Sequence, residues 1–373
     1  MATKNKPNLN SVLVTGGTGF LGTYLVEALH SSQLCTNITV LDLNPPPNPL
    51  KGVNYISGSI LSPETLTHAF ASSRPNVIFH AASPNVTFYR GHPEIYFDVN
   101  VKGTKMMLEK AQEWRVKAFV HTSTAHVYAG NVHVNVAEDG TTWTRENLRV
   151  GEEYALSKSE ADAIVLKEGQ RVDGVNCTVL RLTHLYGEGD TQGIPAALDA
   201  CAPGRPLVQL GKGQNLFDIL SLDNCTQAHI LAAQCLLSPT LAAGPVAGEA
   251  FNISDGPPVR FWEFFEIIYS EGRGRDIKKE MWTMPEWLVW FLCSLIEWIF
   301  WIGTAGTKIP HGVAVLERSI MLYAMWDHWY DGSKAERVLG YVPVGDWRAV
   351  LRESTKTEIE RRKRRADGKV KQT

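Results

Sequence analysis

The segment from Val12 to Gly22 constrains the fold of this chain more than any other. A short apolar run, Val-Leu-Val, leads at once into a turn that contains four glycines and opens a stretch of helical pattern. A buried parallel strand that turns tightly into a helix has this order. Bare glycine backbone and the unpaired N–H groups of a helix start both suit a pyrophosphate. The segment therefore predicts a dinucleotide-binding turn with these candidate residues: Gly16, Thr18, Gly19, Phe20, Leu21 and Gly22.

Asp42 supplies the second half of this motif. The stretch Asn37–Leu41 has the pattern of a strand, and Asp42 ends it twenty residues after Gly22. A carboxylate there accepts both ribose hydroxyls of NAD and repels the 2′-phosphate of NADP. Leu43 and Asn44 supply no cation that would reverse this preference. We therefore expect NAD rather than NADP; the alternative is a glycine-rich turn beside a solvated aspartate.

Strand-like and helix-like segments alternate through the first half of the chain. Short apolar runs and amphipathic stretches follow one another over residues 53–56, 63–72, 77–79, 100–114 and 118–121. This alternation predicts an α/β fold with a Rossmann-type, doubly wound parallel sheet, whose ligand crevice lies at the C-terminal ends of the strands. Several candidate contacts fall at that edge: His80, Ala81, Ala82, Thr122, Ser123 and Thr124.

Tyr154 and Lys158 form the candidate proton-transfer pair. They stand four residues apart, so on a helix they share one face. A free tyrosine titrates near ~10, but an ammonium one turn away and the positive ring of the cofactor favour the phenolate. Such a pair can take the proton of an alcohol as hydride leaves the same carbon. The same spacing also arises on solvated helix faces, yet its place after the dinucleotide motif favours the functional interpretation.

Composition excludes some classes of function. The chain has 373 residues, a net charge of -2 and a pI near 6.6, which argues against nucleic acid as a partner. Six cysteines show no CxxC pair, and residues 1–11 are polar, so we expect reduced thiols on the cytosolic side of any membrane. No histidine pair has a metal-ligand spacing beside a carboxylate or thiolate, so we predict no catalytic metal.

The segment 284–303 is rich in tryptophan and leucine. Only Glu286 and Glu297 in it are charged, and a bilayer crossing needs ~20 apolar residues, so a span interrupted by Glu297 is disfavoured. A helix in the headgroup region or the rim of an apolar substrate tunnel fits better. The alternative is an ordinary core helix. Beyond a predicted helix at 348–360, the basic cluster 361–365 either attracts anionic lipid or is a solvated end.

Taken together, these motifs resemble the 3β-hydroxysteroid dehydrogenase family of extended short-chain dehydrogenases/reductases. The likeness runs from about Ser11 to Glu353. The early motifs are shared across the superfamily, whereas the later ones resemble the sterol branch. The blocks that carry the likeness are 15–22, Asp42, 77–83, 98–104, 154–158, 180–190, 213–233, 250–265, 331–335 and 339–341.

This resemblance implies a catalytic role for four residues. It makes Tyr154 the base, Lys158 the group that lowers the pKa of the tyrosine and binds the nicotinamide ribose, and Asn100 a structural and relay residue. The catalytic hydroxyl of the family stands four residues before a tyrosine in an S-x-x-V-Y pattern. That position is Thr124 here, with Ser123 as the fallback.

The resemblance also implies further cofactor contacts. They are Ser59, Ile60, Ala81, Ala82, Leu182 and His184. Two of them depart from the family pattern, because Ser59 stands where many relatives have aspartate and Leu182 replaces a common proline. Arg90, on a loop where the family gains specificity, is a candidate contact for a substrate carboxylate, with a solvated arginine as the alternative.

We expect three parts: a Rossmann domain over residues 9–182 with a returning segment near 214–237, a smaller and mostly helical substrate-binding part over 183–345, and a helix with a basic tail over 346–373. The resemblance implies NAD-dependent oxidation of the 3-hydroxyl of a sterol or triterpenoid, with decarboxylation where a 4-carboxyl is present. It also implies peripheral association with the cytosolic face of the endoplasmic reticulum membrane, or a cytoplasmic location, and allows a homodimer. The alternatives are a 3β-hydroxysteroid dehydrogenase acting on a non-carboxylated steroid or specialised terpenoid, a nucleotide-sugar epimerase, and a dinucleotide-binding regulator without turnover.

Overall fold

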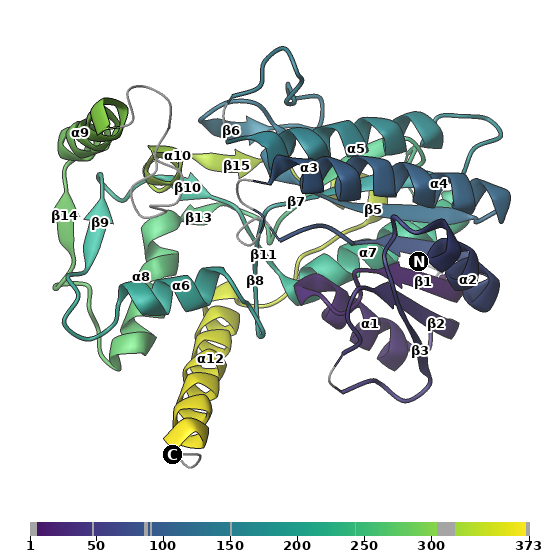
Figure 1. Ribbon diagram of the computed structural model, residues 1–373, viewed down its shortest axis with the longest axis horizontal. Helices are drawn as coiled ribbons and strands as arrows, with labels where there is room; N and C mark the ends of the chain where they lie inside the picture. The colour runs from purple at the N-terminus through teal and green to yellow at the C-terminus, as the bar shows by residue number, and fades with distance from the viewer. Residues whose placement is uncertain are drawn as a thin grey trace.

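A parallel sheet forms the centre of the protein. The computed structural model describes residues 6–46, 48–85, 89, 92–149, 151–242, 244–303 and 318–370. Within them, seven parallel strands lie in the order β12-β7-β5-β4-β1-β2-β3 (Figure 1). Their bounds are β1 Asn10–Thr15, β2 Cys35–Asp42, β3 Val53–Ser57, β4 Val77–His80, β5 Ala118–Thr124, β7 Cys177–Leu182 and β12 Glu249–Ile253. The predicted Rossmann-type sheet is confirmed.

Helices cover both faces of this sheet. On one face lie α1 (Phe20–Ser32), α7 (Leu222–Leu237) and α11 (Ser333–Leu339), which share one hydrophobic core with the strands. On the other face lie α2 (Pro63–Ser73), α4 (Thr104–Glu113) and α5 (Glu153–Gly169), around a second core. Figure 1 shows α4 and α5 above β5 and α7 below it, with α1 and α2 on opposite sides of β1 to β3.

A π-helix interrupts the helix predicted at 100–114. The short α3 (Pro93–Tyr96) leads into the π-helix Phe97–Gly103, and regular α-helix begins only at Thr104. A π-turn adds a residue per turn and often marks a functional position. Gly103 sits where a side chain would collide with Ile60, so the wide turn and the glycine together let this segment pack against the loop after β3.

The remaining elements form the second part of the molecule. It holds four short helices and the long α12, next to three small sheets, in the described residues. The helices are α6 Gly193–Ala200, α8 Phe261–Arg273, α9 Glu286–Gly303, α10 Arg318–Tyr323 and α12 Trp347–Val370. The strands are β6 His133–Val136, β8 His184–Tyr186, β9 Val208–Leu210, β10 Leu216–Phe217, β11 Ile219–Ser221, β13 Val259–Arg260, β14 Trp282–Met284 and β15 His328–Tyr330.

The two parts exchange segments, which corrects the boundaries drawn from the sequence. β12 lies within the predicted substrate-binding part, yet it pairs with β7 at the edge of the main sheet. β6 lies within the predicted Rossmann domain, yet it pairs with β15 in a small sheet of the second part. Each strand is too short for its sequence to reveal its partner, because pairing depends on which sheet edge is open.

A buried ion pair joins α5 to the sheet. The Asp162 carboxylate accepts from Nε of Arg181 at 3.0 Å, and both side chains are almost completely buried. The Arg181 guanidinium also donates to the hydroxyl of Tyr128 at 2.9 Å, and that hydroxyl donates to Asn252 on β12 at 2.7 Å. One cation therefore connects α5, β7, the loop after β5, and β12.

Removing the charge of Asp162 should destabilise the fold strongly. Asp162→Asn leaves the buried Arg181 and Lys158 without a counter-charge, and loss of one partner of a buried pair costs about 3–5 kcal/mol. Urea unfolding measures the loss. Glu160→Gln is the matched control, because Glu160 lies on the same helix and pairs with the exposed Arg145, a contact worth less than about 1 kcal/mol. Equal losses for the two variants would contradict this account.

Candidate active site

The glycine turn between β1 and α1 leaves an open cradle of backbone. Gly16 adopts a left-handed φ of 72°, and a Cβ on it would stand 2.7 Å from the backbone nitrogen of Ala82. A Cβ on Gly22 would overlap the carbonyl oxygen of Gly16. The first turn of α1 has no side-chain cap and no acidic residue, so its N–H groups are open to an anion.

Asp42 stands beside this cradle. It ends β2, and its carboxylate accepts from the backbone N–H of Thr18 at 3.0 Å, which holds it at the turn. Ser59 begins the loop after β3 and accepts from the N–H of Leu61 at 3.1 Å. The bare turn, the open helix start and the carboxylate fit NAD: the turn would hold the pyrophosphate, and Asp42 the adenosine ribose.

Other predicted cofactor contacts lie at the same edge of the sheet. Ala81 donates its N–H to the carbonyl of Thr15 at 3.1 Å, and Ala82 donates to the Thr15 hydroxyl at 3.4 Å, so this loop follows the end of β1. Ile60 is buried beneath it. His80 bonds the hydroxyls of Thr15 and Thr104, and burial lowers its pKa to about 3, which gives it a structural role.

Lys158 is held at the end of β5. Its ammonium donates to the carbonyl oxygen of Thr122 at 2.9 Å, and only 3% of the residue is exposed. Burial lowers the pKa of Lys158 to about 8, and the Asp162 carboxylate one turn further along α5 opposes the shift. The lysine therefore remains charged at neutral pH, within reach of the crevice but without bulk water around it.

Tyr154 lies one turn before Lys158 on α5. Burial raises its pKa to about 12, and the hydroxyl of Ser83 opposes the shift. Its ring meets Tyr96 edge to face, with centroids 5.5 Å apart. The protein's own groups thus favour the phenol, because the loss of hydration on burial is the largest influence on this pKa. The sequence analysis expected the phenolate from Lys158 together with the positive ring of the cofactor. The positive ring of NAD is the additional charge on which that expectation depended.

Asn100 links the loop after β4 to α5. It projects from the π-helix, accepts from the Ser83 hydroxyl at 3.0 Å, and donates to the Ser157 hydroxyl at 2.9 Å. Ser157 in turn donates to the carbonyl of Tyr154 at 2.7 Å. The chain of bonds fixes the start of α5, which is the structural half of the role that the family resemblance implies for Asn100.

The side chains of Thr124 and Ser123 lie in different surroundings at the end of β5. The half-buried Thr124 hydroxyl accepts from the N–H of His126 at 3.2 Å, where the strand enters a short 3₁₀ turn. Ser123 is buried beside Asp162; burial raises the pKa of that carboxyl, and Arg181 and Ser123 oppose the shift. Thr124 therefore has the better access to a substrate, two residues beyond the carbonyl that holds Lys158.

Leu182 and His184 follow at the end of the neighbouring strand. Leu182 pairs with Thr124 and belongs to the core between the sheet and α7. His184 packs against Phe217 and Phe264, and burial lowers its pKa. Its ring borders a cavity, whereas Leu182 offers the crevice no exposed side chain.

A cavity of about 340 Å³ opens at the 3₁₀ turn that follows Thr124. Two lining residues that the sequence analysis did not identify are His126, two residues after Thr124, and Glu152, two residues before Tyr154. Their positions in the sequence, two residues from Thr124 and from Tyr154, were the signal that could have identified them. Arg90 lies outside the described residues. The other lining residues include Tyr128, His133, Trp143, His184, Tyr323 and His328.

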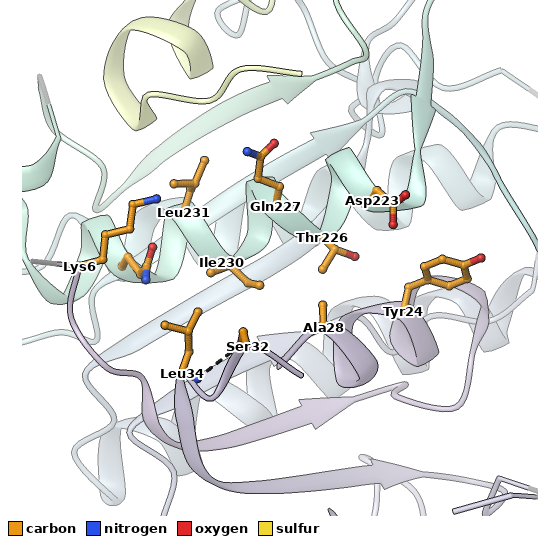
Figure 2. Close-up of a pocket in the computed structure, with 11 residues that line it drawn as sticks. Lys6, Tyr24, Ala28, Ser32, Leu34, Asp223, Thr226, Gln227, Ile230 and Leu231 are labelled. Carbon is orange, nitrogen blue, oxygen red and sulfur yellow. Dashed lines mark hydrogen bonds between the residues drawn. The ribbon is translucent and has the colours of Figure 1, made fainter. Parts of the chain in front are cut away.

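A second cavity, of about 350 Å³, lies between α1 and α7 (Figure 2). Tyr24 and Ala28 border it from α1, and Thr226, Gln227 and Ile230 border it from α7. It lies on the face of the sheet opposite α5. Neither Tyr154 nor Lys158 contributes to it, so it has no place in the chemistry described above.

Fold and site define a dinucleotide-dependent oxidoreductase of the short-chain type. The profile of the 3-beta hydroxysteroid dehydrogenase/isomerase family matches residues 13–285, and the chain belongs to this family. It is 33% identical over 270 residues to the decarboxylating sterol-4-alpha-carboxylate 3-dehydrogenase of Candida albicans, over 70% of this chain and 75% of the relative. The enzyme of the same name from Saccharomyces cerevisiae is 28% identical over 345 residues, covering 90% of this chain and 94% of the relative.

Solved structures show the same fold in enzymes of sugar nucleotides. A UDP-glucose 4-epimerase from Thermotoga maritima superposes with a TM-score of 0.69 at 22% identity, over 94% of this chain and 99% of that one. A dTDP-glucose 4,6-dehydratase from Streptomyces venezuelae, solved with NAD, has a TM-score of 0.70 at 21% identity, over 95% and 98% of the two chains. At these identities the likeness concerns the fold alone.

The lowered pKa of Lys158 predicts a stability that depends on pH. In the unfolded chain a lysine titrates near ~10.4, so between about pH 8 and pH 10 the unfolded state binds more protons than the folded state. Stability of the wild type relative to Lys158→Met should therefore rise across that window, by up to about 3 kcal/mol. Chemical unfolding at pH 7, 8.5 and 10 measures it. Lys167→Met, on the exposed end of α5, is the matched control for removing a lysine from this helix. A flat difference for Lys158→Met would refute the shift.

Proposed function

We propose that this protein is an NAD-dependent dehydrogenase that oxidises the 3-hydroxyl of a sterol or triterpenoid bearing a 4-carboxyl group, with loss of CO2 to give the 3-ketone. The observation that carries the proposal is the position of the Tyr154–Lys158 pair at the strand edge that also bears the glycine cradle. Family membership and the sterol-4-alpha-carboxylate dehydrogenases among the relatives support the substrate class.

Each catalytic side chain would have a separate task. NAD, when bound, supplies the acceptor for the hydride. Thr124 holds the alcohol oxygen, Tyr154 takes its proton, and Lys158 stabilises the negative charge that forms on the phenolic oxygen. Asn100 keeps the first turn of α5 in place through Ser157. Loss of the proton and of hydride from the carbinol leaves a ketone.

Decarboxylation then follows from the product itself. A ketone next to a carbon that carries a carboxyl group is a β-keto acid. Its C–C bond breaks to release CO2, the electron pair forms an enol, and a proton on the ring carbon restores the ketone. No second acid–base pair is required, and Tyr154 with Lys158 is the pair that the sequence and the crevice provide.

The proposal is tested by incubating the purified protein with a 4-carboxysterol and either NAD or NADP. We expect NADH and CO2 in equal amounts, and much slower reaction with NADP because of Asp42. Tyr154→Phe should lower kcat by about 10²–10⁴-fold, the usual contribution of a positioned acid–base group. Tyr269→Phe, which changes a tyrosine in the second part, is the control. NADH without CO2 would favour a non-carboxylated steroid, and unchanged activity of Tyr154→Phe would overturn the mechanism.

We further propose that helix α9 rests on the membrane from which the sterol is taken, the cytosolic face of the endoplasmic reticulum. Five large apolar side chains, spaced three or four residues apart along α9, are 43–69% exposed: Trp287, Phe291, Leu295, Trp298 and Ile302. Val289 and Cys293 occupy the opposite face and are buried. This exposure argues against an ordinary core helix.

Length and composition alone would allow α9 to cross a bilayer, and among the described residues it is the one helix that meets this test. The exposed stripe and the buried face instead favour a helix lying in the interface. Figure 1 shows α9 at the edge of the second part, away from the main sheet and from α12. In the basic cluster, Arg361 and Arg362 pair with Glu358 on the same helix, and Arg362 also pairs with Asp199 on α6, so these two charges are engaged within the protein.

Membrane docking through α9 predicts a loss of vesicle binding when the stripe is made polar. Burial of a large apolar side chain contributes about 1.5–3 kcal/mol, so the double change Trp287→Gln and Trp298→Gln should weaken binding to phosphatidylcholine vesicles at least about tenfold in flotation assays. The control changes Val342 and Val344 to serine, since both are 63% exposed elsewhere. Binding that survives the tryptophan changes would rule out this surface.

A further inference from the structure

The cavity beside Thr124 is lined by histidines. Within the described residues its lining contains His126, His133, His184 and His328, and no lysine or arginine. His133 and His328 are joined by a hydrogen bond between their Nδ1 atoms at 3.2 Å, and His328 stacks on Tyr323 at 4.1 Å. His184 is wedged between two phenylalanines. Three of the four rings are thus occupied in packing.

His126 differs from the other three. Its side chain is exposed to the cavity, and its imidazole has no hydrogen-bond partner among the described residues. It touches Tyr323 only edge to face, with centroids 6.0 Å apart. A neutral imidazole offers one N–H donor and a protonated one offers two, so the ring can donate to an acceptor in the cavity in either state.

The position of His126 relates it to the reacting carbon. Its backbone N–H donates to the hydroxyl of Thr124, the residue that would hold the alcohol oxygen. If Thr124 holds the alcohol oxygen, a group on the ring carbon next to the carbinol lies near the 3₁₀ turn that carries the imidazole. Glu152 is the one carboxyl group among the described lining residues; burial and Glu153 raise its pKa, and Arg149 opposes the shift.

We propose that His126 is a specificity-determining residue that binds the carboxyl group next to the carbinol carbon of the substrate. The inference rests on the proposed function and names the side chain that would recognise its substrate class. In a cavity without lysine or arginine among the described lining residues, the imidazole N–H is the accessible donor closest to Thr124 in the chain. A hydrogen bond to a carboxylate in such surroundings favours the acid over its ester by about tenfold.

The test compares a 3-hydroxy-4-carboxysterol with its methyl ester. Dissociation constants are measured by calorimetry with NADH in place of NAD, so that the alcohol binds without reacting. The wild type should bind the acid about tenfold more tightly than the ester. His126→Phe, which keeps a ring edge against Tyr323, should remove this preference by weakening the acid alone. His126→Gln keeps an N–H donor and should retain part of the preference.

Two further variants complete the experiment. Glu152→Gln removes the opposing carboxyl group and should strengthen binding of the acid without affecting the ester. His68→Phe, on the exposed face of α2, is the matched control and should leave both constants unchanged. The inference is overturned if His126→Phe weakens acid and ester equally or weakens neither. Failure of the proposed function has a separate sign, because the wild type would then form no NADH from the carboxysterol and NAD.

Discussion

Lys158, the lysine of the proposed proton-transfer pair, depends on a buried ion pair next to it. Lys158, Asp162 and Arg181 are three charged residues with little access to solvent, and together they carry one net positive charge at neutral pH. Two charges compensate each other, and the third is left at the end of β5, where it faces the crevice. Because Arg181 is also bonded to Tyr128 and to the carbonyl of Glu138, this arrangement cannot shift without disturbing several elements.

The surroundings keep that charge uncompensated. His80 and His121 stack at 5.4 Å beside Lys158, and burial together with the lysine lowers the pKa of both rings, so they remain neutral. A negative charge that forms on Tyr154 is therefore stabilised by one uncompensated positive charge, the ammonium of Lys158. The groups of the protein itself still favour the neutral phenol, because burial raises the pKa of Tyr154. The positive nicotinamide ring of NAD, held by the cradle at the glycine turn, would add the charge that favours the phenolate.

The second part contributes much of the lining of the cavity after β5. Its small sheets and the cavity are built partly from β6 and from the turn after β5, both of which precede α5 in the chain. The interleaving places His126 and Glu152 in the lining of one cavity. In the same part, α9 exposes an apolar stripe, so the chain combines a histidine-lined cavity with an apolar outer surface.

Much of the first half of the fold could be predicted because its signals are local. The strand before Gly16, the helix after it and the carboxylate at Asp42 each follow from steric and electrostatic rules that act over a few residues. The pair of Tyr154 and Lys158 shares a helix face by spacing alone. The π-turn around Asn100 escaped prediction, since its residues have no pattern distinct from an α-helix and the wide turn is stabilised by contacts with Ile60, Ser83 and Ser157.

By itself, the sequence determined the sheet type, the position of the cradle and the helix face of the proton-transfer pair, because periodicity and glycine placement are properties of neighbouring residues. Only the tertiary structure decided that β12 completes the sheet, that the ion pair of Asp162 and Arg181 lies next to Lys158, and that His126 borders the cavity. These features depend on which segments, distant in the sequence, pack together and on how much water is excluded between them. The same exclusion of water determines the pKa values of Tyr154 and Lys158, which spacing along the chain cannot reveal.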